Sequence, residues 1–455
     1  MKRRLITISN LQTLYAILAA KPVGVTDELS PKETIHPLNL EQIQQVAQKQ
    51  KATIVEYSII NLDHLFIWVI KPSGKITFHP VHLQPLRQEQ NTSLSELVHQ
   101  ARESLEVPEK RHDAPRLLRQ LHEILIEPIA SLLPTDPNVP VIFIPQGNLF
   151  LVPFPALQDA NGKFLIEQHT IVTAPSIQVM DLTHQRRQQL GARSLESLKP
   201  QDVLVAGNPT MPSIAPVIGE PPQQLAALPA AGAEANAIAS FLNTQAILGA
   251  RATKVDIMQQ MPKARLIHLA THGLLDDIRQ LGVPGAIALA PSSEDNGFLT
   301  AGEILELKLN AELVVLSACV TGLGKLTGDG VIGLSRCLMA AGVPRLIVSL
   351  WPVSDLSTAF LMINFYENLK NFTQLQPGDV AKAFNQSQKW LLNLTSEEAK
   401  QELEKLKSHI YQAFAGISKR LAEARINRYF QDICDRAPHP FANPVYWSAF
   451  TTIGL

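Results

Sequence analysis

The chain has 455 residues, 45% of them apolar, and this length predicts two or three domains rather than one. The formal net charge is −1 and 18% of the residues are charged, so we expect neither nucleic acid nor a membrane surface as a partner. Three cysteines are too few for a disulfide framework and are typical of a reducing compartment, so we expect a cytoplasmic protein.

Residues 1–40 are expected to form an N-terminal segment and linker. The opening sequence MKRRLITISNLQTLYAILAAKP loosely imitates a signal peptide, but polar residues at positions 9, 10, 12 and 13 interrupt its apolar stretch. A helix or strand is therefore favoured, with export as the alternative. No segment of the chain approaches the roughly 18 uninterrupted apolar residues of a membrane helix.

Residues 41–195 are predicted to form a first half with its own strands. A helix, LEQIQQVAQKQK, precedes three β-rich runs, ATIVEYSII, LFIWVIKP and KITFHPVHL, whose short turns predict paired hairpins or a meander. Helical patterns then cover 93–106 and 113–133, and VPVIFIPQ is expected to be a buried strand. A polar stretch over 186–200 indicates a boundary.

Residues 196–455 alternate apolar strands with helical patterns. The strands include DVLVAGNP, ARLIHLATHG, GAIALAP, AELVVLSAC and PRLIVSLWPV. This alternation predicts an α/β fold, with a mostly parallel sheet that helices cover on both faces. Because both halves carry such strands, a duplicated fold is suggested, although no clean sequence repeat supports it.

Residues 395–430 form one long amphipathic pattern, in which Thr395 and Glu398 fit a capping box. We expect a solvated helix that packs through one stripe. A docking helix for a partner is the alternative.

Two residues at strand ends could carry chemistry. His272 follows the strand LIHLA and Cys319 follows the strand VVLSA. In a parallel sheet, catalytic groups gather beyond the carboxyl ends of the strands. If these two strands are neighbours, an imidazole can take the proton of the thiol and later protonate the leaving amine. The structural alternative is a small buried cysteine and a core or capping histidine.

The same site needs hydrogen-bond donors for the tetrahedral oxyanion. Gly273 lets the main chain approach a substrate carbonyl closely, so we expect the backbone N–H groups of Gly273 and Cys319 to form the oxyanion hole.

Other candidate residues are interpreted as structural. Cys337 and Cys434 are expected to have no catalytic role, and His268 is expected to be a core histidine with satisfied hydrogen bonds. The glycine-rich TGLGKLTGDG fails the spacing of a phosphate-binding loop, because Lys325 is followed by Leu326. No Cys/His cluster has zinc spacing, so we expect neither a metal nor another cofactor.

Taken together, these motifs resemble the CHAT family, a branch of the caspase and separase superfamily of cysteine peptidases. The resemblance rests on LIHLATHG, LTAGEI, LVVLSACVTGLG, GDGVIGLSRCLMAAGVPRLIVSLWPVSD and NPVYWSAFTTIGL, in this order, and it extends from about residue 40 to 455. It implies a caspase-like α/β fold in which His272 and Cys319 are the catalytic dyad. By analogy with separase, residues 41–195 would form an inactive caspase-like half and residues 196–455 the catalytic half.

The resemblance also implies a preference for cleavage after Arg or Lys. Asp355 in LWPVSD lies where separase carries an acidic residue that receives the basic side chain, and Asp329 is a second acidic candidate. The alternatives are an N-cap for Asp355 and a helix N-terminal residue for Asp329. Val320 stands where many relatives carry a polar residue, which alters the expected substrate pocket. Many relatives carry helical repeats upstream, and residues 1–40 show none, so recruitment or activation is expected to come from elsewhere.

Two functions of different classes follow. The favoured one is a cysteine endopeptidase that acts on protein substrates and is regulated by a protein partner. The alternative is a non-catalytic caspase-like scaffold whose dyad is present but never turns over.

Overall fold

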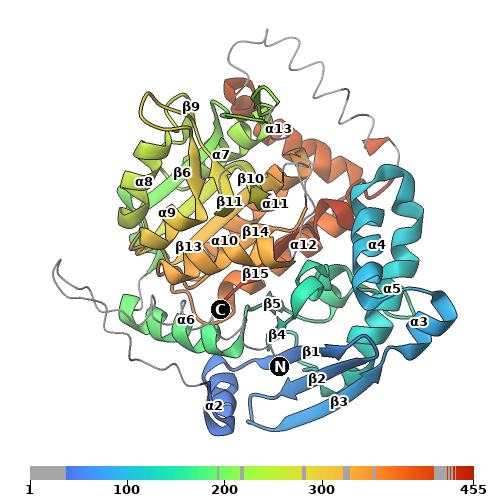
Figure 1. The fold of residues 1–455 in the computed structure, drawn as a ribbon. Helices are drawn as coiled ribbons and strands as arrows, with labels where there is room; N and C mark the ends of the chain where they lie inside the picture. Colours follow the sequence, from blue (N-terminus) through green and yellow to red (C-terminus); the bar gives the residue numbers. More distant parts are fainter. Residues whose placement is uncertain are drawn as a thin grey trace.

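The computed structural model describes residues 37–191, 194–215, 220–278, 283–320, 328–351, 355–413, 428, 431, 434–435 and 437–455 (Figure 1). For some residues within these ranges, Cys319 among them, only the backbone is described. The predicted α/β architecture is confirmed, because a mostly parallel sheet runs through the molecule with helices on both faces. Among the described helices, none is both long and apolar enough to cross a membrane.

Thirteen of the described strands form one sheet. Its order is β12-β11-β10-β13-β14-β15-β5-β4-β1-β2-β3, with β6 also paired to β10, and β9 to β6. The first half contributes β1 (Thr53–Asn61), β2 (His64–Ile70), β3 (Ile76–His82), β4 (Val141–Ile144) and β5 (Ile171–Thr173). The second half contributes β6 (Val203–Pro209), β9 (Ile247–Gly249), β10 (Leu266–Ile278), β11 (Val283–Ala288), β12 (Phe298–Thr300), β13 (Leu313–Val320), β14 (Leu346–Ser349) and β15 (Phe450–Ile453).

Strands β1, β2 and β3 form the antiparallel meander that the short turns predict. One face of these strands, which carries Tyr57 and Ile67, packs on α4 (Leu94–Glu106) and α5 (Ala114–Leu125). The other face, which carries Ile54 and Ile70, packs on α2 (Leu40–Gln50) and α6 (Ile177–Leu190). The remaining helix of this half is α3 (Gln84–Gln90).

Helices of the second half divide between the two faces of the sheet (Figure 1). On one side lie α8 (Lys254–Gln260), α9 (Ala301–Glu306) and α10 (Gly328–Ala340). On the other lie α7 (Pro229–Phe241), α11 (Asp355–Leu369), α12 (Asp379–Asn393) and α13 (Ser396–Ala413). A small separate hairpin consists of β7 (Ser213–Ile214) and β8 (Gln223–Gln224).

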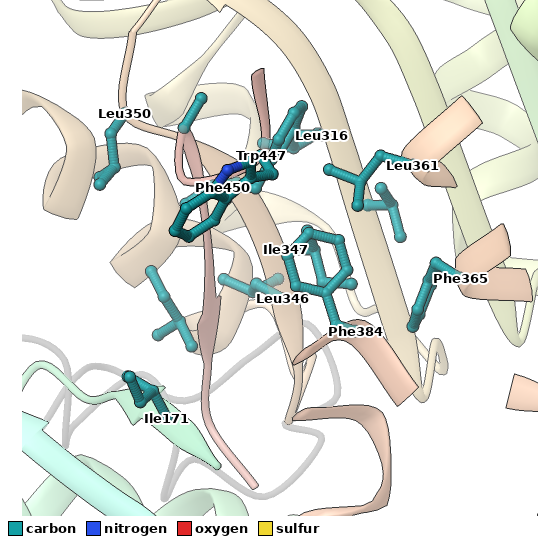
Figure 2. Close-up of a cluster of buried hydrophobic side chains, with 14 of the residues drawn as sticks. Ile171, Leu316, Leu346, Ile347, Leu350, Leu361, Phe365, Phe384, Trp447 and Phe450 are labelled. Atoms are coloured by element: carbon teal, nitrogen blue, oxygen red, sulfur yellow. The ribbon is translucent and has the colours of Figure 1, made fainter. Parts of the chain in front are cut away.

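The core continues across the boundary between the halves because β15 lies between β14 and β5. Figure 2 shows Phe450 of β15 among side chains from both halves, including Ile171 of β5, Ile347 of β14 and Phe384 of α12. The rings of Phe450 and Phe384 lie 6.2 Å apart in an edge-on arrangement, and both side chains are buried. One hydrophobic core therefore serves both halves.

One expected helix needs correction, and two further expectations can be compared with the structure. The helical pattern over 113–133 is not one helix: α5 ends at Leu125 and a 3-10 helix covers Glu127–Leu132, because Pro128 cannot continue an α-helix. The sheet is mostly parallel, as predicted. Outside the β1–β3 meander, β11 runs antiparallel to β10 and β12, and β15 runs antiparallel to β14 but parallel to β5. The pattern over 395–430 begins as α13, with the predicted capping box in place, while residues 414–427 lie outside the described residues.

Candidate active site

On one side, strand β10 pairs first with one strand and then with another. The candidate site lies where the second pairing begins. Over residues 266–270 one edge of β10 pairs with β6, and from Gly273 onward the same edge pairs with β11. The opposite edge pairs with β13 over residues 266–273. His272 therefore lies where the β6 ladder has ended and the β11 ladder begins, at the carboxyl end of the parallel strands.

Strand pairing brings the two predicted catalytic residues together. His272 of β10 is the register partner of Cys319 of β13 in a parallel ladder. Neighbouring strands lie about 4.8 Å apart, and directly paired residues occupy the same face of a sheet. The fold therefore brings together two positions that are 47 residues apart in the sequence, at the carboxyl end of the parallel strands. The side chain of Cys319 lies outside the described part of the structure.

The imidazole of His272 is held by a backbone acceptor. Its Nε2 lies 2.8 Å from the carbonyl oxygen of Ala226. A carbonyl only accepts, so Nε2 carries the proton and the neutral ring presents an unprotonated Nδ1. Nδ1 is buried and has no hydrogen-bond partner among the described residues. Burial lowers the pKa of His272, and the bond to Ala226 offsets this only in part, so the ring is a neutral base near pH 7.

Ala226 is positioned by a small apolar cluster at the β7–β8 hairpin. Because Ala226 directly follows Leu225, which packs against this cluster, the cluster fixes the carbonyl that orients His272. The buried members are Ile214, Leu274, Ala286, Ala288 and Phe298.

The remaining predicted site residues lie at the same edge. Gly273 pairs with Ile287 of β11 on one side and with Val320 of β13 on the other. Asp355 is the first residue of α11, soon after β14 ends, and Asp329 lies in the first turn of α10. The side chains of Val320, Asp329 and Asp355 lie outside the described part of the structure.

Sequence reasoning missed a contribution of the first half to this edge. The Arg102 guanidinium on α4 donates from Nη2 to the carbonyl of Leu350, just after β14, at 2.9 Å, and to Glu106 at 2.6 Å. The ladder between β13 and β14 ends where Leu316 pairs with Val348, and Trp351 lies two residues after the end of β14. Trp351 is fully buried, and its Nε1 has no partner among the described residues. A lone arginine inside a helix gives no sequence signal for this contact.

His268 has the structural role that the sequence predicts. Its ring is fully buried, with Nε2 2.9 Å from Glu234 of α7 and Nδ1 3.1 Å from the hydroxyl of Tyr366 of α11. Both ring nitrogens are satisfied, as a buried polar group requires. His268 therefore links α7 and α11 to β10 through hydrogen bonds.

The other two cysteines are free thiols in apolar surroundings. Burial raises the pKa of Cys337 to about 11 and also raises the pKa of Cys434. A thiol with such a pKa is a poor nucleophile near neutral pH. The described residues contain no group of three or more His, Cys, Asp or Glu side chains that could hold a metal ion.

Several solved structures are similar to this chain, and two of them show how far the overlap extends. One is the Saccharomyces cerevisiae separase–securin complex, at 11% identity and a TM-score of 0.47, over 76% of this chain and 29% of that chain. The other is gingipain R, an Arg-specific cysteine proteinase, at 10% identity and a TM-score of 0.37, over 75% of this chain and 66% of that one.

Comparison of sequences gives relatives and a family. Tetratricopeptide repeat protein 28 from Homo sapiens is 28% identical over 295 residues, and its Mus musculus counterpart is 27% identical over 299. Each alignment covers 56% of this chain, and the chain spans only 12% of the relative's length. The CHAT domain profile matches residues 115–455. Because this match covers well over half of the chain, the protein belongs to the CHAT domain family.

Proposed function

We propose that this protein is a cysteine endopeptidase in which His272 is the base and Cys319 the nucleophile. The observation that carries the proposal is their direct pairing across β10 and β13. Membership of the CHAT family and the free Nδ1 of a neutral His272 support it.

The proposed chemistry follows from the tautomer of His272. Nδ1 takes the thiol proton of Cys319, and the thiolate sulfur attacks the scissile carbonyl carbon. The backbone N–H groups of Gly273 and Cys319 stabilise the oxyanion. The imidazolium, whose Nε2–H remains bonded to Ala226, then donates its Nδ1 proton to the leaving amine. Water hydrolyses the resulting thioester and restores the thiol.

We further propose that substrates carry Arg or Lys on the acyl side of the scissile bond. A carboxylate at a strand end can accept a guanidinium bidentately, and Asp355 and Asp329 follow β14 and β13 at this edge. Val320, at the end of β13, would shape the same pocket. In this proposal residues 1–40 are a leading segment, 41–195 a caspase-like half without a dyad, and 196–455 the catalytic half.

Regulation by a protein partner is part of the proposal. His272 is only 7% exposed in this structure, so a substrate needs the residues that cover it to move aside. A partner that moves the residues covering Nδ1, while the carbonyl of Ala226 stays bonded to Nε2, would expose the base. A scaffold without turnover is the competing function, and the same burial is the observation that favours it.

A thiol-directed peptidyl probe with a basic residue at its reactive end separates the two functions. We expect selective labelling of Cys319 that is lost in His272→Ala and kept in Cys337→Ala, the matched control. Matched reporter peptides with Arg, Lys or Leu before the scissile bond then test specificity. Equal labelling of all three cysteines, with no Cys319-dependent cleavage in the presence of candidate activating partners, would refute the peptidase and leave the scaffold.

A further inference from the structure

A cavity lies at the amino ends of the parallel strands, at the end of the sheet opposite to His272 and Cys319. It is a cavity of about 280 Å³ at the amino ends of β13 and β14. Since six residues of β13 separate its start from Cys319, the two sites are about 20 Å apart. The lining comes from three places: the end of α6, the residues just before β13 and β14, and the loop between α11 and α12. The lining residues that matter below are Arg187, Glu312, Arg345 and Gln376.

Arg345 in this pocket is a buried cation with an unused donor. The residue is 3% exposed. Its Nη2 donates to the carbonyl of Leu375 at 3.0 Å, and its Nη1 lies 3.5 Å from the carbonyl of Glu312. Its Nε is buried and has no partner among the described residues. An unpaired donor on a buried cation lowers the stability of the folded state, so a hydrogen-bond acceptor next to Arg345 would stabilise it.

A second guanidinium lines the same cavity. Arg187 of α6 is partly buried, its Nη1 donates to the main-chain oxygen of Leu455 at 2.6 Å, and its Nη2 lies 3.4 Å from Nδ1 of His184. Burial, and then the positive charge of Arg187, lower the pKa of Arg345 to about 9. Two like charges facing one cavity favour an anion between them.

The acidic groups nearby already have other partners. Glu312, on the cavity wall, accepts a hydrogen bond from Nε of Arg265 at 2.7 Å. Asp379 accepts from the backbone N–H of Gln376 at 2.8 Å and lies 3.9 Å from Lys382. Glu312 opposes an incoming anion, and its charge acts on Arg345, as does that of Asp379, which also acts on Arg187. These two side-chain carboxylates are shared with Arg265 and Lys382, so the cationic side chains around the cavity outnumber the carboxylate side chains.

We propose that this cavity binds a small phosphate-type oxyanion between Arg187 and Arg345. Guanidinium groups match the oxygens of a phosphate group with several donors at once, and Arg187 and Arg345 both line this cavity. The volume lies just below that of drug-sized ligand pockets, which suits a small ligand. Because α6 belongs to the first half and Arg345 to the second, the bound anion ties the two halves together.

Inorganic phosphate is the first probe, added at constant ionic strength and followed by calorimetry and thermal unfolding. We expect saturable binding and a rise in Tm for the whole chain, since a ligand of the native state stabilises it. Arg187→Gln should weaken binding at least tenfold. Arg186→Gln is the matched control, because Arg186 contacts the carbonyls of Leu309 and Gly342 instead, and it should keep the wild-type affinity.

Phosphoserine in a parallel titration distinguishes the source of the ligand: binding equal to phosphate indicates a phosphomonoester, and weaker binding indicates the free anion. Arg345→Met should also abolish binding, and if it fails to fold, Arg187→Gln carries the test. Cys319→Ala should bind phosphate normally, so this test is independent of the proposed peptidase. No saturable phosphate binding, or equal losses in Arg187→Gln and Arg186→Gln, would overturn the proposal.

Discussion

The hydrogen bonds of the buried His268 give a prediction that distinguishes a structural role of this residue from a catalytic one. Tyr366→Phe removes one hydroxyl and leaves a nitrogen of the fully buried His268 without its partner at 3.1 Å. An unsatisfied buried polar group costs about 1–3 kcal/mol, so the free energy of unfolding should fall by about that amount. His268 lies four strand residues before His272, about 13 Å away, so labelling of Cys319 by the peptidyl probe should be nearly unchanged.

Urea unfolding measures the first effect, with an unchanged m-value showing that the denatured state is the same. The labelling rate of the folded variant, measured at matched pH, measures the second. A loss of stability below about 0.5 kcal/mol would show that His268 does not depend on the hydroxyl. A tenfold fall in labelling rate would show that His268 communicates with the dyad, which contradicts the purely structural role.

Three further predictions follow from the site and the core. Cys319→Ala should abolish turnover with little loss of stability, which an activity assay paired with a thermal melt will check; a melt lowered by many degrees would contradict this. Burial lowers the pKa of His272 below 6.5, so the unfolded state binds its proton first; wild-type stability should be full above about pH 6.5 and fall below it more steeply than that of His272→Gln in pH-dependent urea titrations. Parallel slopes would show that His272 does not titrate this way. Phe450→Ala should cost about 3–5 kcal/mol in the same titrations, whereas Leu62→Ala, at a side chain 68% exposed, should cost less than about 0.5 kcal/mol, and similar losses would refute the shared core.

The pairing of His272 with Cys319 could be predicted because the two apolar strand segments are visible in the sequence. Apolar runs that precede His272 and Cys319 indicate two buried strands, and parallel pairing brings the two residues into register. The sequence did not show that β10 continues past His272 to Ile278. Hydrophobic periodicity does not reveal strand direction, so the antiparallel pairs β10–β11, β11–β12 and β14–β15 could not be recognised from it. Pro128 did carry a signal, since a proline within a helical pattern predicts a break there.

Contacts that depend on the backbone left no trace in the sequence. The carbonyl of Ala226 orients His272, yet any residue at position 226 offers a carbonyl. Arg187 and Arg345, which line the proposed phosphate cavity, lie 158 positions apart. A single arginine in a sequence indicates a surface residue unless its burial is known. Such pairs are recognised only once the chain is folded.

The central place of β15 has a consequence for how the molecule assembles and fails. Thr451 on this strand meets Thr173 of β5 across 278 positions, so the ladder between the halves closes only through a contact of very long range. Such closures are slow, and until this one forms, β14 and β5 both present unpaired edges that can capture strands of other molecules. A protease cut just before Phe450 that released β15 would leave β14 and β5 unpaired in the same way. We expect aggregation to be the first observable result.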